Sequence, residues 1–422
     1  MTGNRAGHRV AALLLVLWAT GPLVARTWTV GPDGVHKKLA VALASAEPHD
    51  TIRVLQGTYS EGTLTIDRPL TLIGIGRPVI DGGRQGDVLV ITAPDVTVQG
   101  FVVRGTLLSN IDDNAGIKVK KSDNVKILDN VLEHCFFAIH VSNSRNTVVA
   151  GNSVLGDPDE IETRQANGIH LWRCSGAEVV DNVSQDHRDG IYFEFVTDSH
   201  VRRNKSMRNS RYGLHFMFSH RDTYSDNLFT ENGAGVAVMY SKEVEMRRNR
   251  FISNRGASSY GLLLKEINDV VIDSNQFINN TTGMLVDGCN RAEVNGNIFQ
   301  ANGWALRLFA NATDGRFTGN SFIGNTFDMS TNGNPVYNSF SGNYWDRYQG
   351  YDLEHDGTGD VPFRPVSLFA MVNERMPYAV VLSRSLLTQL LDRAERLVPS
   401  MTPPGLEDDK PLMRSPHGTR NL

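Results

Sequence analysis

The chain has 422 residues, a formal net charge of -4 and 21% charged residues. Its length would suffice for two or three ordinary domains, but no Pro- or Ser-rich linker divides it before its C-terminal part, so one continuous architecture is expected. The near-neutral charge balance excludes the global basic field that nucleic-acid-binding proteins carry.

Residues 1–25 have the pattern of a secretory signal peptide. Arg5, His8 and Arg9 precede the apolar run VAALLLVLWA, and the segment ends at a small residue, Ala25. The apolar run is too short to span a bilayer comfortably, and no later stretch is apolar enough to do so. We therefore expect cleavage after Ala25 and export of the mature chain to the periplasm.

Residues 26–365 are expected to form one parallel β-helix with caps. The segment HKKLAVALASA is typical of a short helix, which would close the N-terminal end of a solenoid. The segments TIRVLQGTY, PLTLIGIG and DVLVITAPDVTVQGFVV then begin a coil of short strands, although less regularly than the segments that follow.

The middle of the chain is an internal repeat. Asparagines end short alternating segments, with gaps of 22, 30, 22, 23, 22, 26, 22, 23 and 23 residues. This first series is Asn130, Asn152, Asn182, Asn204, Asn227, Asn249, Asn275, Asn297, Asn320 and Asn343. A second series lies five residues later, at Asn209, Asn232, Asn254, Asn280, Asn302 and Asn325. Phenylalanines recur two residues after the first series, at Phe229, Phe251, Phe277, Phe299 and Phe322.

This period predicts a right-handed parallel β-helix of roughly 22-residue coils, in which equivalent residues stack about 4.8 Å apart. Stacked asparagine amides would hydrogen-bond along the turns, and stacked phenylalanines would fill the core. Leucine-rich repeats have a similar period, but the chain lacks their leucine-asparagine consensus, and no helix-length pattern separates the strands. The insertions GDPDEIETRQA and GASSY are expected to leave the coil as loops.

The C-terminal region departs from the repeat. The Gly-, Asp- and aromatic-rich stretch YWDRYQGYDLEHDGTGDVPFRPVS should close the solenoid. Residues 366–398 show apolar residues at helical spacing and predict amphipathic helices interrupted at Pro377. We expect Leu382, Leu386 and Leu390 to contribute to docking on a partner. The tail, residues 399–422, is rich in proline and charge and is expected to be extended or disordered.

Short units such as GIHL recur once per coil, each beginning at a small residue. Alternation predicts that the second and fourth residues after this small residue point to solvent, as His170 and Trp172 do after Gly168. One column of such residues contains His140, His170, Tyr192 and His215, and the next contains Trp172, Glu194, Met217 and Met239. We call the surface bearing His170, Trp172, His215, Met217 and Met239 the His/Met face.

Two interpretations of the His/Met face are open. Thioether and imidazole ligands favour copper, especially Cu(I), so His170, His215, Met217 and Met239 are candidate metal ligands. Aromatic and methionine side chains also populate protein interfaces, which makes Trp172 and Tyr192 candidate docking residues.

The cysteines and carboxylates give little evidence for a disulfide or a catalytic site. Cys174 and Cys289 share a column five coils apart, so no disulfide can join them, and all three cysteines are expected to be buried. A carbohydrate-active lyase or epimerase would need a base such as His187 with a charge-neutralising group such as Arg188. The sequence shows no tight cluster of stacked acids on one face of the kind that a glycosidase needs.

Several segments resemble one family. These are NGIHLWRC, DGIYFEFV, RYGLHFMFSHRDTYSDN and GAGVAVMYSKEVEM, followed by GNYWDRYQGYDLEHDGTGDVPFRP and the helix MVNERMPYAVVLSRS. They are similar to the NosD family, periplasmic proteins that act in maturation of the copper centres of nitrous oxide reductase. The likeness covers essentially the whole mature chain, and the terminal segment is its most specific part.

The resemblance implies a non-enzymatic accessory protein. Its implied partners are an ABC transporter of NosF ATPase and NosY permease subunits, the copper chaperone NosL and the apo-reductase NosZ. The chain would be associated with the membrane through the permease and would handle copper transiently. A carbohydrate-active enzyme, or a pure docking scaffold without metal affinity, remains the alternative.

Overall fold

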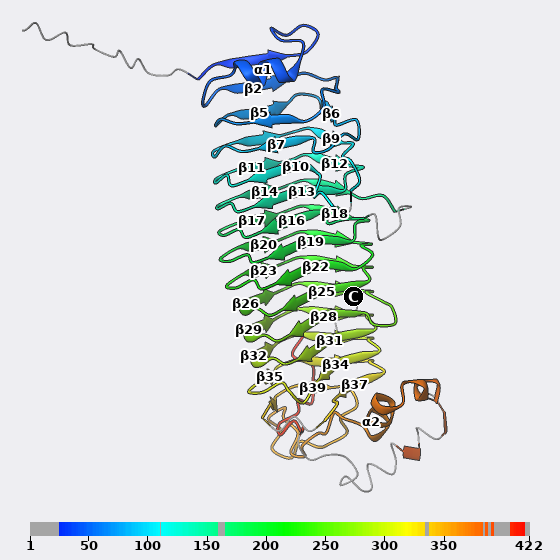
Figure 1. The fold of residues 1–422 in the computed structure, drawn as a ribbon. Coiled ribbons are helices and arrows are strands. Elements are labelled where there is room, and N and C mark those ends of the chain that lie inside the picture. The colour runs from blue at the N-terminus through cyan, green and yellow to red at the C-terminus, as the bar shows by residue number, and fades with distance from the viewer. Residues whose placement is uncertain are drawn as a thin grey trace, which may run out of the picture.

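The computed structural model describes residues 25–109, 111–158, 165–333, 337–382, 385–386, 390–391 and 406–417. These residues form one elongated right-handed parallel β-helix, as the repeat predicts (Figure 1). Each coil contributes one strand to each of three sheets, so strands that are neighbours in space come from successive coils. The predicted signal peptide lies outside the described residues except for Ala25. Among the described helices, none is both long and apolar enough to cross a membrane.

Sheet A has 14 strands. They are β1 (Thr27–Val30), β2 (Thr51–Val54), β5 (Thr71–Gly74), β8 (Thr97–Gln99), β11 (Lys126–Leu128), β14 (Val148–Ala150), β17 (Glu178–Val180), β20 (His200–Arg202), β23 (Thr223–Ser225), β26 (Lys242–Arg247), β29 (Asn268–Asp273), β32 (Asn290–Asn295), β35 (Arg316–Thr318) and β38 (Ser339–Ser341).

Sheet B has 13 strands. They are β3 (Thr58–Tyr59), β6 (Val79–Asp81), β9 (Val102–Arg104), β12 (Val131–Glu133), β15 (Ser153–Leu155), β18 (Val183–Gln185), β21 (Lys205–Met207), β24 (Leu228–Thr230), β27 (Arg250–Ile252), β30 (Gln276–Ile278), β33 (Ile298–Gln300), β36 (Ser321–Ile323) and β39 (Tyr344–Trp345).

Sheet C has 12 strands and carries the His/Met face on its outer side. They are β4 (Leu64–Ile66), β7 (Leu89–Ile91), β10 (Ala115–Lys120), β13 (Phe137–Ser142), β16 (Ile169–Trp172), β19 (Asp189–Glu194), β22 (Tyr212–Met217), β25 (Ala234–Met239), β28 (Tyr260–Lys265), β31 (Thr282–Asp287), β34 (Trp304–Leu308) and β37 (Phe327–Ser330).

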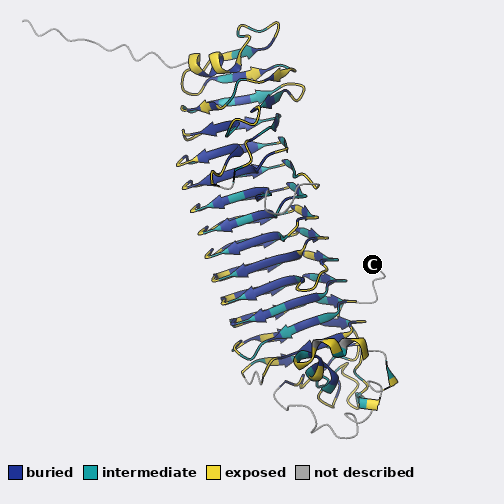
Figure 2. Cartoon of the chain, turned by 45° about the vertical axis from the view of Figure 1, so that its right-hand side comes forward, coloured by how far each residue is buried: buried dark blue, intermediate teal, exposed yellow. Residues whose placement is uncertain are grey.

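Two ladders hold the coils in register, and both were predicted. From Asn130 to Asn343 each asparagine of the first series donates its Nδ2 to the Oδ1 of the next, at 2.9 to 3.1 Å. The phenylalanines from Phe229 to Phe322 are fully buried and stack with ring centroids 4.7 to 5.5 Å apart, and Trp345 continues the stack at 4.0 Å. The paired amides satisfy buried polar groups while the rings fill the narrow interior. Figure 2 shows the buried strands along the whole body and the exposed turns.

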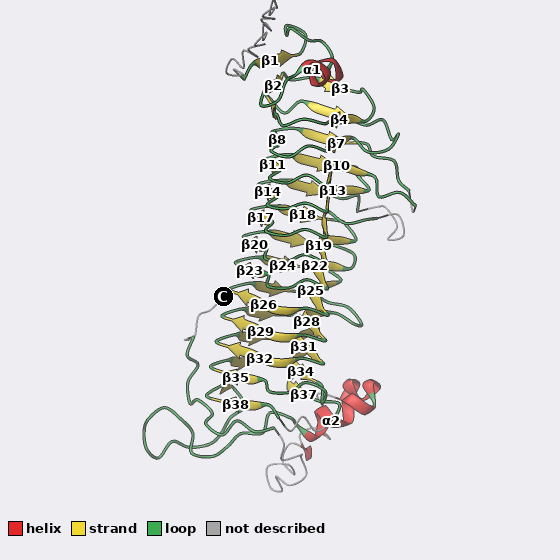
Figure 3. Cartoon of the chain, turned by 60° about the vertical axis from the view of Figure 1, so that its left-hand side comes forward, coloured by secondary structure: helices red, strands yellow, loops and turns green. Residues whose placement is uncertain are grey.

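Helices lie at the two ends of the solenoid (Figure 3). At the N-terminal end α1 (Leu39–Ser45) buries Leu39, Ala42 and Leu43. At the other end α2 (Leu368–Arg375) begins after Ser367, whose hydroxyl accepts a hydrogen bond from the Ala370 amide. The 3₁₀ helix η2 (Pro377–Leu382) follows directly, so the helical run is interrupted at Pro377 as expected.

The C-terminal tail is the main departure from the expected organisation. Residues 406–417 do not run free, because Leu406 and Asp408 are buried and Asp408 forms isolated bridges to Phe340 and Phe363. The Asp408 carboxylate accepts hydrogen bonds from the backbone N and the Nδ2 of Asn343, the last asparagine of the ladder. The tail therefore closes the end of the solenoid.

Candidate functional site

The outer side of sheet C is built by the predicted alternation. Strand pairing places Lys118, His140, His170, Tyr192, His215, Ala237, Leu263, Leu285 and Arg307 in one row across successive coils. The side chains between them, such as Ile169 and Leu171, are buried in the core. The predicted columns of the His/Met face are therefore correct.

The expected exposure of this row is wrong. His140 and His215 are only 7% and 6% exposed, and His170 and Tyr192 are half-buried. The four rings touch in coil order with centroid separations of 5.0, 4.7 and 4.6 Å: His140 and His170 meet edge to face, His170 and Tyr192 are tilted, and Tyr192 and His215 are stacked. We call this row of touching rings the ring stack. The ring of Phe137 lies 5.5 Å from His140 and from His170. Because the coils bring these rings into contact, each ring shields the next from solvent.

Burial keeps two imidazoles of the stack uncharged at neutral pH. It lowers the pKa of His140 to about 4, although the nearby carboxylate of Asp113 opposes the shift. Burial, together with the neighbouring His140, holds the pKa of His170 well below its usual range. Neither ring nitrogen of His170, nor Nδ1 of His140, has a hydrogen-bond partner among the described residues. Neutral imidazoles with free lone pairs are the form in which histidine binds metal.

A buried charge pair supports the far end of the stack. Asp189 is fully buried and receives two hydrogen bonds from Arg211, and Nδ1 of His215 lies 3.7 Å from one of its oxygens. Burial alone would raise the pKa of Asp189, but the bonds from His215 and Arg211 hold it below the usual range. Asp189 therefore orients Arg211 and His215 and is itself fully engaged.

The structure pairs the two predicted methionines but does not gather all four candidate ligands. Met217 lies opposite Met239 on adjacent strands, and both are half-buried. The Tyr192 hydroxyl lies 3.7 Å from the Met217 sulfur. His170 is separated from His215 by the ring of Tyr192, two coils away. Within the described ranges, no group of three or more His, Cys, Asp or Glu side chains is arranged to hold a metal ion.

A cleft of about 600 Å³ opens beside the N-terminal half of the face. Sequence reasoning missed it, because one wall comes from a segment outside the repeat that carries Ile111, Asp112 and Asp113. The floor includes Lys118, bound to Asp87 at 2.9 Å, together with His140, His170, Trp172 and Glu194. The two uncharged histidines line this cleft, but both ring nitrogens of His170 and Nδ1 of His140 are themselves buried.

The predicted docking residues lie in two separate places. Trp172 is half-buried at the cleft, with the Arg173 guanidinium 4.6 Å from its ring. Burial raises the pKa of Tyr192 to about 12, so its hydroxyl stays protonated. The leucines Leu382, Leu386 and Leu390 are 43%, 77% and 62% exposed at the opposite end of the body.

Phe218 corrects one detail of the predicted alternation. Strict alternation would point it inward with Leu214 and Phe216, but β22 ends at Met217 and Phe218 occupies the turn, 36% exposed. Its ring stacks between Phe195 and Tyr240, with centroids 5.2 and 5.1 Å away. Sequence reasoning missed this exposed aromatic stack, which we define as Phe195, Phe218 and Tyr240. Aligning the residue after each fourth position would have found it.

The cysteines and the candidate catalytic base are buried. Burial raises the pKa of Cys135 to about 12, that of Cys174 to about 11 and that of Cys289 to about 12, so all three thiols stay protonated. His187 is 2% exposed and takes the place of an asparagine in the second ladder, where its backbone amide donates to Asn209. Burial lowers its pKa to about 4. His187 is thus placed as a buried residue, which also lines a small pocket of about 90 Å³ together with Cys135 and Asp186.

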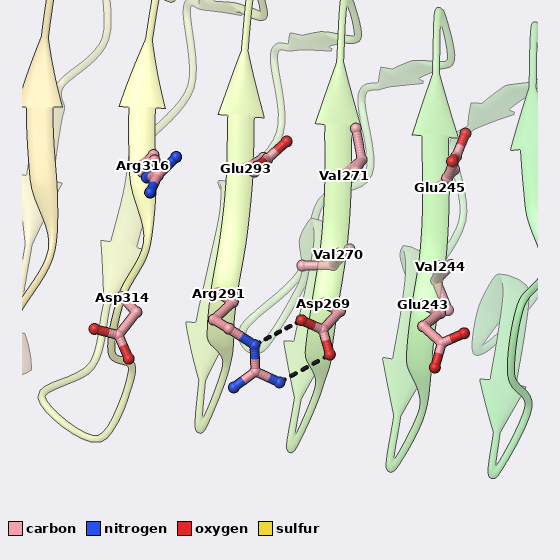
Figure 4. Close-up of a pocket in the computed structure, with 10 residues that line it drawn as sticks. All are labelled: Glu243, Val244, Glu245, Asp269, Val270, Val271, Arg291, Glu293, Asp314 and Arg316. Carbon is pink, nitrogen blue, oxygen red and sulfur yellow. Dashed lines mark hydrogen bonds and ion pairs between the residues drawn. The ribbon is translucent and has the colours of Figure 1, made fainter.

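A second hollow of about 620 Å³ lies on the outer side of sheet A (Figure 4). Its side chains come from β26, β29, β32 and β35 and the turn before β35, and five acidic residues among them stand against two arginines. Arg291 binds Asp269 through two hydrogen bonds, one of several Arg–Asp pairs that link successive coils. Because the hollow has no histidine, methionine or cysteine among its lining residues, we do not assign it to the site.

Comparison with known proteins places this arrangement in a family. Residues 155–350 match the family described as "Periplasmic copper-binding protein (NosD)". A "Probable ABC transporter binding protein NosD" from Stutzerimonas stutzeri is 30% identical over 98% of this chain and 96% of its own length. The chain belongs to the NosD family. A NosD protein of the same description from Pseudomonas aeruginosa is also 30% identical, over 99% of this chain and 97% of its own length.

Solved structures share the fold of this NosD family member at low sequence identity. The Dettilon tailspike protein has a TM-score of 0.55 and 10% identity, covering 69% of this chain and 64% of the tailspike. The surface adhesin PfbA of Streptococcus pneumoniae has a TM-score of 0.51 and 13% identity, covering 71% of this chain and 86% of the adhesin. At this identity the likeness extends to the β-helix and to nothing in its chemistry.

Proposed function

We propose that this chain is a non-enzymatic periplasmic accessory protein for assembly of the copper centres of nitrous oxide reductase. It handles Cu(I) as transient cargo on the His/Met face while docked to its partners. The observation that carries the proposal is the pairing of Met217 with Met239 beside a row of histidines, two of which burial keeps uncharged. Membership of a family described as copper-binding supports it.

The geometry favours transfer over storage. A storage site would enclose the ion in three or four fixed ligands, whereas this face offers a thioether pair and, further along, imidazole edges at an open cleft. Soft thioethers select Cu(I), and a site of few ligands releases it readily. Copper would reach the face from the chaperone NosL and leave to the apo-reductase NosZ.

The partners follow from the family and from the exposed ends of the molecule. The two relatives are named as ABC transporter binding proteins, which supports association with a NosF ATPase and a NosY permease. Leu382, Leu386 and Leu390 form an exposed apolar group at the C-terminal end, suited to the permease. No observation favours a lyase or epimerase, because its candidate base His187 is buried.

Competition titration of the purified protein with a Cu(I) chelator under reducing conditions tests the cargo role. The double variant Met217→Leu and Met239→Leu keeps volume and apolarity but removes both sulfurs, so Cu(I) affinity should fall about tenfold or more while the melting temperature changes little. Met207→Leu, on a half-buried methionine of sheet B, is the matched control. Unchanged affinity in the double variant would refute the methionine pair as the cargo site, whereas absence of Cu(I) binding by the wild-type protein would leave a pure docking scaffold as the function.

A further inference from the structure

Three successive coils carry an aromatic residue where the backbone disfavours one. From β10 to β31 the residue after each sheet C strand adopts a left-handed conformation, with φ of 53°, 51° and 52° at Phe195, Phe218 and Tyr240. Other coils place Asn143 and Gly288 in this column, the residue types that tolerate such a φ best, or the long polar side chains of Lys121, Arg173 and Glu266. The three aromatic residues are the only apolar ones among these left-handed positions, and a bulky side chain is disfavoured there by contact with the backbone.

The exposed aromatic stack adds a solvation penalty to that strain. Phe195, Phe218 and Tyr240 are 42%, 36% and 41% exposed. Contact between the rings offsets part of the penalty, but an asparagine in each coil would avoid both the strain and the exposure. A contiguous exposed apolar group of this kind marks an interaction surface. Met217 and Met239 precede Phe218 and Tyr240 directly and widen the surface.

The orientation of the rings restricts what can cover them. Phe195 and Phe218 are nearly parallel at 7°, and Phe218 and Tyr240 at 17°, so the ring faces are turned toward each other. The outer face of Phe195 is approached by the Arg173 guanidinium at 5.8 Å. Sugars and bases stack on free ring faces, whereas thioethers, carbonyl oxygens and other aromatic rings pack against ring edges. The edges that remain suit a protein partner.

The spacing of the stack selects a helix. Successive rings are 5.2 and 5.1 Å apart along the solenoid axis. An α-helix lying along that axis repeats every ~5.4 Å and presents one side chain per turn to each ring. An extended strand in the same direction repeats every ~6.6 Å on one face and drifts out of register by the third ring. Arg173 and Glu266 occupy the same column in the coils before and after the stack, and they favour an acidic residue at one end of the apolar stripe of the helix and a basic residue at the other.

We propose that the exposed aromatic stack docks an amphipathic α-helix of a partner protein, laid along the solenoid axis with apolar side chains three or four residues apart against the three rings. This inference rests on the proposed function and adds a second docking surface to it. The surface also lies directly beside the methionine pair, so a helix seated on the stack would bring its protein to the copper-handling side chains.

Photo-crosslinking in cells that mature the reductase tests the geometry. p-Benzoylphenylalanine is placed at Phe195, Phe218 or Tyr240 in the full chain, with Tyr337, 71% exposed elsewhere, as the control position. The three sites should crosslink in order to residues three or four apart in one partner segment, and position 337 should not reach that segment. The proposal is overturned if the crosslinked residues are two apart or lie in unrelated segments. It is also overturned if position 337 crosslinks equally strongly, or if no crosslink forms.

A stability control separates docking from a structural role. Asparagine suits the left-handed column, so the triple variant Phe195→Asn, Phe218→Asn and Tyr240→Asn should keep its melting temperature within about 3 °C of the wild type. Recovery of the crosslinked partner with this variant should fall tenfold or more. A lower melting temperature with undiminished recovery would assign the stack to the fold and overturn the inference. The Cu(I) affinity of the triple variant should equal that of the wild type, because no methionine is changed. Failure of the wild-type protein to bind Cu(I) would therefore refute the proposed function without affecting the crosslinking result.

Discussion

The buried carboxylate of Asp408 should be a principal determinant of the stability of the C-terminal coils. One of its oxygens accepts hydrogen bonds from the backbone N and Nδ2 of Asn343 and from Nε1 of Trp345, at 3.0, 2.9 and 3.0 Å. The other accepts from the backbone amides of Gly342 and Lys410, both at 3.1 Å. Asp408 and Asn343 are fully buried and Trp345 is 1% exposed. The carboxylate thus takes the place of the next asparagine in the ladder.

Asp408→Ala leaves the backbone N of Asn343 and Nε1 of Trp345 without an acceptor, while Nδ2 of Asn343 keeps only its bond to the Phe317 carbonyl. Each buried unpaired donor costs about 1–3 kcal/mol, and partial access of water to the terminal coil reduces the sum, so we expect a loss of roughly 3–5 kcal/mol. Asp408→Asn keeps one acceptor oxygen and should lose less. Because solenoids unfold from their ends, the loss should appear first as faster hydrogen exchange in residues 321–345.

The assay combines thermal unfolding with hydrogen exchange read by mass spectrometry. Asp409→Ala removes a neighbouring carboxylate that is exposed, and it serves as the matched control. The reasoning is refuted if Asp408→Ala exchanges in residues 321–345 at the wild-type rate, or if Asp409→Ala has the same effect.

Three further predictions concern the core, the pH dependence and the permease contact. Phe277→Ala opens a cavity in the phenylalanine stack between Phe251 and Phe299 and should cost about 3–5 kcal/mol in chemical denaturation; a loss under ~1 kcal/mol would contradict a packed stack. Burial raises the pKa of Asp222 from 3.8 to about 8. Between pH 3.8 and about 8 the folded chain therefore holds one proton more than the unfolded chain, so the free energy of unfolding should fall as the pH rises through this range. Asp222→Asn should therefore raise the melting temperature near pH 8 and leave it unchanged near pH 4; equal effects at both pH values would refute the assignment. Replacing Leu382, Leu386 and Leu390 by serine should leave the melting temperature unchanged, because these residues are exposed. The same variant should no longer co-purify with the transporter, and full recovery of the complex would show that these leucines do not contact the permease.

The sequence determined the architecture because every coil repeats the same local choices. An asparagine at a bend and a phenylalanine two residues later, as in Asn275 and Phe277, recur at a nearly constant interval, so aligning the repeats also aligns the strands. The pairing of Met217 with Met239 follows from the same alignment. Alternation also predicted correctly that His215 lies on the outer side of sheet C.

Alternation could not predict how far that outer side is covered. His140 and His215 are buried by rings from neighbouring coils, and the cleft beside them depends on the wall formed by Asp112 and Asp113. The reversal of Phe218 has a related cause. Strand β22 ends at a bend that recurs in the coils from β10 to β31, and the left-handed residue at that bend directs its side chain outward whatever its hydrophobicity.

The docking of the tail was decided by tertiary structure alone. Asp408 lies 65 residues after Asn343, in a segment whose proline and charge predict little order by themselves. Its partners are the last unsatisfied donors of the asparagine ladder, and those donors converge only after the coils have stacked. Local sequence encodes each rung of the ladder, but the need for a final acceptor is a property of the assembled solenoid, so only the folded structure shows which residue meets it.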